Sequence, residues 1–106
     1  MSKPYRDYHE GLIEALNDPD EAAEYLNAAL EERDQAAFLK ALRNVVQARG
    51  MTATAQATGL NREGLYRMLS KRGNPELASL ERLLESLGLR LTVQASGREA
   101  VKDLSP

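Results

Sequence analysis

The chain has 106 residues, of which 42% are hydrophobic and 28% charged, with one histidine (His9) and no cysteine. This length suits one domain with a modest core, and the composition excludes disulfides, zinc sites built from histidine and cysteine, and catalytic pairs that need a cysteine or a second histidine. The start of the chain has no apolar signal core, and no apolar run approaches the roughly 20 residues that span a bilayer. We therefore expect a cytoplasmic protein that makes no membrane contact.

The charges are divided unevenly along the chain. Residues 1–42 carry ten acidic and four basic side chains, whereas residues 43–72 carry six basic side chains and one acidic side chain, that of Glu63. An acidic half joined to a basic half suggests two binding surfaces. The alternative is a solvated acidic face beside a chance cluster of basic residues. The overall charge of −2 argues by itself against nucleic acid.

Three helices are expected in the N-terminal half. The first covers Tyr5–Leu16 and ends before Pro19, because proline disfavours helix in the residue before it. Asp18 is placed to cap the second helix, and Asp34 to cap a third helix that ends at Gly50. The residues expected to face the core are Ala22, Ala23, Leu26, Ala29 and Leu30 in the second helix, and Phe38, Leu39, Leu42, Val45 and Val46 in the third.

Two short helices and a longer one follow. They are expected at about Thr52–Thr58, Arg62–Lys71 and Leu77–Leu87, with a turn at residues 59–61 and Gly88 as the final stop. In the last helix, the residues expected to point inward are Leu77, Leu80, Leu83, Leu84 and Leu87.

The last predicted element is a strand. Leu89 to Gln94 alternates apolar and polar residues, which is typical of a half-buried strand. One strand alone has no partner for its backbone groups and invites pairing with another chain. We expect it to join two copies of the chain through Leu89, Leu91 and Val93, although a weak N-terminal strand would also serve as a partner.

The segment from Met51 to Ser70 has the residue types of a helix-turn-helix unit. Ala55 is small where the second helix must cross the first, and Gly59 stands where a tight turn needs a positive φ. Leu60 follows as an apolar plug, and Asn61 is a good cap for the second helix. The inward residues of that helix are expected to be Leu65, Met68 and Leu69.

One position departs from this pattern. Thr54 stands where such units usually carry an apolar residue. A plain helical bundle with a basic face is therefore the alternative to a DNA-binding unit.

The outward side of the second short helix is the candidate DNA-reading surface. Arginine can bind guanine with two hydrogen bonds, and glutamate can accept one from cytosine. The expected base-reading residues are Arg62, Glu63, Tyr66 and Arg67. The expected phosphate contacts are Thr52, Asn61, Ser70, Lys71, Arg72 and Asn74.

Four stretches resemble a known family. They are YLNAALEERD at 25–34, ALRNVVQARGMT at 41–52, TGLNREGLYRMLSKRGNPEL at 58–77 and SLERLLESLGLRLTV at 79–93. Through them the chain resembles the addiction-module antidote family, HigA-like antitoxins with an Xre-type helix-turn-helix. The resemblance implies a RelE/HigB-like toxin that cleaves mRNA on the ribosome as partner, and repression of the promoter that both genes share. It gives the reading role to Arg62, Glu63, Tyr66 and Arg67, and no residue for contact with the toxin.

Together these features predict a mainly α protein, a lambda-repressor-like helix-turn-helix bundle of about five or six helices with one C-terminal strand. Residues 1–96 would form one domain, with acidic helices at 1–49, the helix-turn-helix at 51–72, and a helix and strand at 77–95, before a flexible tail at 97–106. We expect a homodimeric antitoxin and repressor of its own operator DNA that is not an enzyme and binds no cofactor or metal. The alternative is a protein-binding module that kept the helix-turn-helix shape without specific DNA binding.

Overall fold

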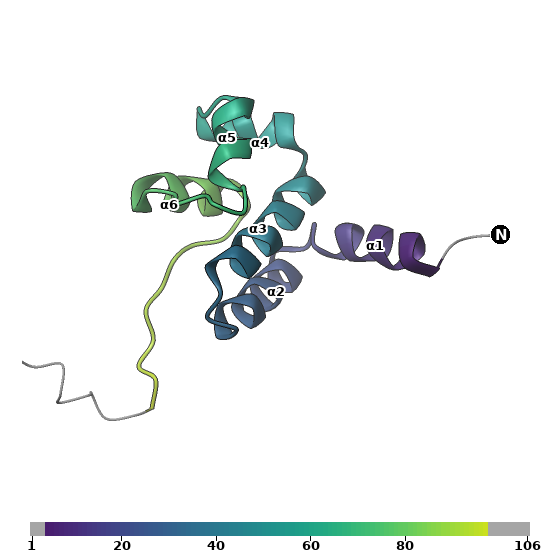
Figure 1. Cartoon of the computed structure of the whole chain (residues 1–106), viewed down its shortest axis with the longest axis horizontal. Helices are drawn as coiled ribbons and strands as arrows, with labels where there is room; N and C mark the ends of the chain where they lie inside the picture. The colour runs from purple at the N-terminus through teal and green to yellow at the C-terminus, as the bar shows by residue number, and fades with distance from the viewer. Residues whose placement is uncertain (1–3, 98–106) are drawn as a thin grey trace, which may run out of the picture.

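The computed structural model describes residues 4–97 of the chain, with side chains from Tyr8 onward. Within this range the fold is all helical (Figure 1). The helices are α1 (Pro4–Ala15), α2 (Pro19–Glu31), α3 (Gln35–Arg49), α4 (Met51–Thr58), α5 (Arg62–Met68) and α6 (Leu77–Ser86). Helix α3 packs against α1, α2 and α4, and α4 packs in turn against α5 and α6. The helix-rich bundle expected from the sequence is confirmed. None of the described helices is both long and apolar enough to cross a membrane.

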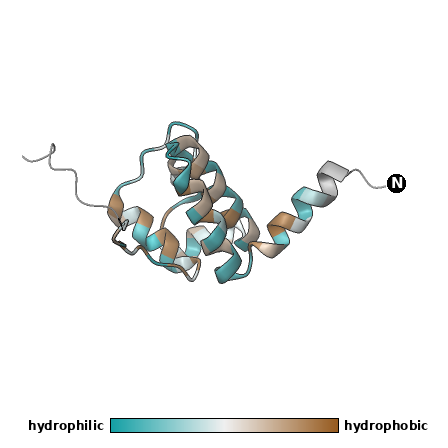
Figure 2. Cartoon of the chain, turned by 90° about the horizontal axis from the view of Figure 1, so that it is seen from below, coloured by the Kyte–Doolittle hydropathy of each residue, from teal (hydrophilic) through white to brown (hydrophobic). Residues whose placement is uncertain are grey.

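One apolar cluster joins the helices. Leu42 and Val46 of α3, Leu65 of α5 and Leu83 of α6 are all fully buried in it. The cluster starts at Leu16, directly after α1, so only the C-terminal end of that helix reaches the core. The rest of α1 projects away from the bundle (Figures 1 and 2).

The expected helix starts are confirmed by their caps. Asp18 accepts a hydrogen bond from the Asp20 backbone N–H (3.0 Å), and Asp34 accepts from the N–H groups of Ala36 (3.0 Å) and Ala37 (3.4 Å). Each such cap is worth about 1 kcal/mol of stability relative to alanine. They fix the borders of α2 and α3, the two helices that pack side by side (Figure 1).

The end of α6 turns the chain back onto the core. Gly88 has a φ of 80°, its N–H donates to the Glu85 carbonyl (3.0 Å), and the Leu89 N–H donates to the Leu84 carbonyl (2.8 Å). This pair of bonds is a Schellman motif, in which a left-handed residue lets the last carbonyls find partners. Leu89 is thereby packed against the core.

The strand expected at Leu89–Gln94 is wrong for the single chain, since residues 89–96 form neither strand nor helix. A strand needs a neighbour for its backbone groups, and no other strand exists among residues 4–97. Leu91 is 41% exposed and Val93 is fully exposed. Beyond Gly97, the predicted flexible tail lies outside the described residues.

Two leucines expected in the core lie at the surface. Leu77 is 64% exposed and Leu30 is 53% exposed. Leu77 is the first residue of α6 and Leu30 the last but one of α2, so both occupy terminal turns that neighbouring helices do not cover. The periodicity of a helix predicts which side turns inward, but not how far along the helix its neighbours reach.

Candidate nucleic-acid interface

Helices α4 and α5 form a helix-turn-helix unit joined by residues 59–61. Gly59 has a φ of 77°, and its N–H donates to the Ala55 carbonyl (3.0 Å). Asn61 caps α5 by accepting from the Gly64 N–H (2.6 Å). The predicted roles of Gly59 and Asn61 are therefore confirmed. The second helix ends at Met68, three residues before the predicted Lys71, because the chain turns at Leu69.

The inner side of the unit is the predicted one. Leu65 and Leu69 are fully buried, and Ala55 is 8% exposed where the two helices meet. Leu60 and Met68 are half-buried against the same cluster. This packing fixes α5 on the bundle and leaves its other side to solvent.

Two threonines of α4 are buried in different ways. The Thr54 side chain is 1% exposed, and its hydroxyl has no hydrogen-bond partner in the described part of the chain. The Thr58 hydroxyl donates to the Thr54 carbonyl (2.8 Å) and accepts from the Leu60 N–H (3.2 Å), so it ties the end of α4 to the turn. Position 54 is therefore buried, as the helix-turn-helix pattern predicts for an apolar residue, although its side chain is polar. The role of Thr58 was not predicted, although a hydroxyl directly before a turn glycine was the available signal.

Three long side chains hold backbone carbonyls at the borders of the unit. Arg43 of α3 donates through Nε and Nη2 to the Leu69 carbonyl (3.2 and 2.8 Å). Gln35 Nε2 donates to the Gly73 carbonyl (2.9 Å), and Arg82 Nη1 donates to the Thr58 carbonyl (3.3 Å). Arg43 counts toward the basic stretch in the sequence, but in the structure its guanidinium anchors the end of α5.

The outward side of α5 carries the four predicted base-reading residues, and all are exposed. Glu63 Oε1 and Arg67 Nη2 lie 3.4 Å apart, with 86% and 74% of their side chains exposed. Arg62 donates to the Tyr66 hydroxyl (3.3 Å) and lies 5.8 Å from the centre of its ring. Exposed ion pairs and exposed contacts between a cation and an aromatic ring each contribute at most about 1 kcal/mol, so both arginines can exchange these contacts for a ligand.

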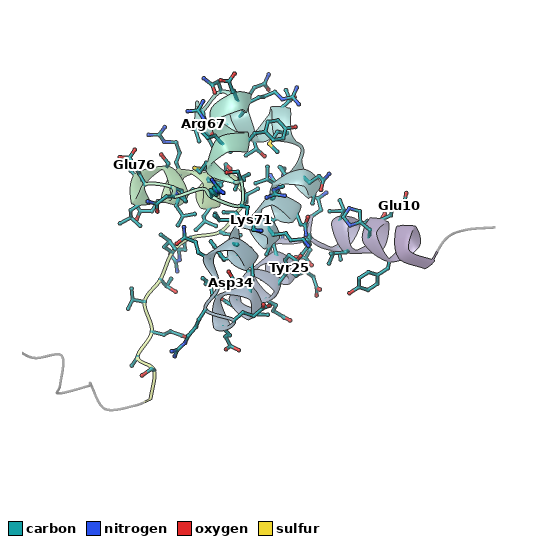
Figure 3. The ribbon with its side chains drawn as sticks, viewed as in Figure 1. Glu10, Tyr25, Asp34, Arg67, Lys71 and Glu76 are labelled. Atoms are coloured by element: carbon teal, nitrogen blue, oxygen red, sulfur yellow. The ribbon has the colours of Figure 1, made fainter. Side chains whose placement is uncertain are left out.

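Five of the six predicted phosphate contacts line two shallow grooves next to this surface. One groove includes Arg67, Ser70, Arg72 and Asn74, and the other includes Thr52, Asn61 and Arg62. Lys71 lines neither groove and lies nearer the middle of the molecule than Arg67 does (Figure 3).

Three side chains at these grooves change the predicted set of phosphate contacts. Ser70 donates its hydroxyl to the Arg67 carbonyl (2.8 Å), so that proton is already used within the chain. Gln56, which was not predicted, lines the second groove with an exposed side chain that can donate to phosphate. Glu76, an acidic residue, lines the first groove together with Arg67 and Arg72.

Residues 4–97 define a helical fold whose helix-turn-helix unit presents two arginines, a tyrosine and a glutamate to solvent. The chain belongs to the family of probable addiction module antidote proteins, whose model matches residues 9–95. It is 35% identical over 96 residues to an uncharacterised protein of Haemophilus influenzae, covering 91% of this chain and 97% of that one. No solved structure matches the chain. Family membership supports an antitoxin role, and an antidote implies a toxin as partner.

Proposed function

We propose that the chain is the cytoplasmic antitoxin of a type II toxin–antitoxin module. It would neutralise a RelE/HigB-like toxin that cleaves mRNA, and repress its own operon by binding operator DNA through α4 and α5. It would do so as a regulator without enzymatic activity. The observation that supports DNA binding most is the outward side of α5, with Arg62 and Arg67 exposed on a helix whose inner side and end are fixed.

The physical basis of the reading step is the exchange of weak contacts for stronger ones. Arg67 would leave the exposed pair with Glu63 and bind a guanine edge, where a good bidentate contact discriminates by about 1–3 kcal/mol. Arg72, Asn74 and Thr52 would contact phosphates from the two grooves beside α5. These contacts set position and affinity, while the base contacts set specificity.

We further propose that two copies bind a palindromic operator. A single recognition helix reads few base pairs, and two-fold proteins read half-sites about 34 Å apart. Residues 89–95 are the proposed dimer interface, since Leu91 and Val93 are exposed and alternate with polar residues. Thr92 and Gln94 line one pocket with Leu30, near the end of α2, and Arg33, just after it, so this part of the chain would support one side of an intermolecular strand pair.

The test is a fluorescence-anisotropy titration of a duplex containing the chain's own promoter, repeated at several salt concentrations. Release of counterions from neutralised phosphates gives a steep fall of log K with log salt concentration. A scrambled duplex of equal length is the control. Absence of binding, or binding with a flat salt dependence, would refute operator recognition by α5.

A protein-binding module without specific DNA contact is the second candidate. It is favoured by two acidic residues, Glu63, which pairs with Arg67, and Glu76, which lines the same groove as Arg67 and Arg72, because their carboxylates would oppose phosphate. The same titration separates the two candidates, because only the first predicts tighter binding to the promoter than to the scrambled duplex.

A further inference from the structure

From Tyr8 onward, one side of the N-terminal helix α1 is exposed to solvent. Half-buried His9, Leu12 and Ile13 mark the side of α1 turned toward the bundle. The opposite side is exposed, and we name it the outward face of α1. Its residues are Tyr8, Glu10, Gly11, Glu14 and Ala15. Because α1 projects from the bundle, this face is open to a partner along its length (Figures 1 and 2).

An aromatic residue and two small residues line one edge of this face. Tyr8 is 73% exposed, and Gly11 and Ala15 follow it at positions i+3 and i+7. A Cβ placed on Gly11 would meet nothing within 4 Å, so the fold itself does not require glycine there. Glycine inside a helix is less stable than alanine. A glycine that the fold does not need, beside an exposed tyrosine, fits a surface that another molecule approaches closely.

The charge of the first two helices indicates the chemistry of that molecule. From Tyr8 to Glu32 the chain carries eight acidic residues and neither lysine nor arginine, with two of the acidic residues in α1 and six at positions 18–32. Glu10 and Glu14 lie on the outward face itself, and Glu10 is seen on the projecting helix, far from Arg67 (Figure 3). Phosphate would be repelled here, so the occupant is a basic protein surface and not nucleic acid.

We propose that the outward face of α1 is the docking site for a basic protein and, building on the proposed function, that this protein is the toxin. Tyr8 enters a groove of the toxin, Gly11 and Ala15 allow the two backbones to approach, and Glu10 and Glu14 pair with cations at the rim. An enzyme that cleaves RNA must bind phosphates through basic residues. An acidic helix that covers those residues excludes the RNA, which gives neutralisation a direct electrostatic cause.

The experiment measures the Kd between variants of the full chain and the purified protein encoded by the adjacent gene of the same operon. Tyr8→Ala should weaken binding by about tenfold or more, as truncation of a buried aromatic anchor does. Gly11→Ala should also weaken binding while it raises the Tm, because the added methyl favours the helix and obstructs the partner. A general loss of folding cannot produce this opposite pair of effects.

Charge is tested with a matched pair of double variants. Glu10→Lys with Glu14→Lys should slow association and weaken binding by about tenfold or more, and the effect should shrink at high salt. Glu81→Lys with Glu85→Lys makes the same charge change on exposed residues of α6 and should leave the Kd within about twofold. Operator binding by Tyr8→Ala and Gly11→Ala should equal that of the parent chain.

Two outcomes would overturn the proposal and point to different errors. If the parent chain binds the toxin and all three α1 variants bind it within about twofold, the docking site is wrong and the antitoxin role stands. If the parent chain does not bind that protein at all, the proposed function and the docking site are both wrong.

Discussion

Replacement of Thr54 by valine tests whether α4 carries a polar side chain at a core position. Thr54 is 1% exposed, and its hydroxyl has no partner within residues 4–97. Thr58, four residues later, is also buried, but its hydroxyl both donates and accepts a hydrogen bond. The same substitution at the two sites therefore removes an unsatisfied group in one case and a satisfied group in the other.

The expected changes in the free energy of unfolding have opposite signs. Burial of an unsatisfied hydroxyl costs about 1–3 kcal/mol in mutational data, and valine fills nearly the same volume, so Thr54→Val should stabilise the protein by about 1–2 kcal/mol. Thr58→Val leaves the Leu60 N–H without its acceptor and should destabilise the protein by about 1–3 kcal/mol. Helix propensity contributes little, since threonine and valine rank closely.

Thermal unfolding followed by far-ultraviolet circular dichroism measures both effects. For a chain of this size, 1 kcal/mol shifts the Tm by about 4–8 °C. Thr52→Val, at an exposed position of the same helix, is the control and should stay within about 0.5 kcal/mol of the parent. A Thr54→Val variant that is less stable than the parent would refute the reasoning, because its hydroxyl would then have to be satisfied.

Three further predictions concern the proposed DNA contacts and assembly. Arg67→Ala should weaken operator binding by about 1–3 kcal/mol and binding to a scrambled duplex much less; equal losses in the anisotropy assay would argue against base reading. Arg43→Met should lower the Tm and weaken operator binding together, since the Leu69 carbonyl loses its donor; normal DNA affinity would show that α5 needs no such anchor. Val93→Asp should give a monomer in sedimentation velocity at concentrations where the parent is a dimer. An unchanged dimer would show that residues 89–95 are not the dimer interface.

The features that the sequence predicts correctly are the ones decided within a few residues. Asp34 caps α3 through N–H groups two and three residues away, and Gly59 closes its turn onto a carbonyl four residues back. Such bonds depend on local residue types and on φ, both of which can be inferred from the chain itself. The contact between Arg43 and the Leu69 carbonyl spans 26 positions, and a carbonyl has no sequence signature. This contact could therefore not be predicted from the sequence.

The candidate phosphate contacts show a second reason why the site could only partly be predicted. Ser70 is predicted to contact phosphate, but in the structure its hydroxyl donates to the Arg67 carbonyl, so its only proton satisfies the end of α5. Asn61 accepts from the Gly64 N–H through Oδ1, as the sequence predicts for a cap, and this bond does not use the amide N–H groups that would donate to phosphate. The last carbonyls of a helix need hydrogen-bond donors, and donors are also what phosphate binds. A short hydroxyl side chain beside the C-terminal end of a helix therefore donates to a backbone carbonyl. Long side chains such as those of Arg67 and Arg72 extend into the groove instead.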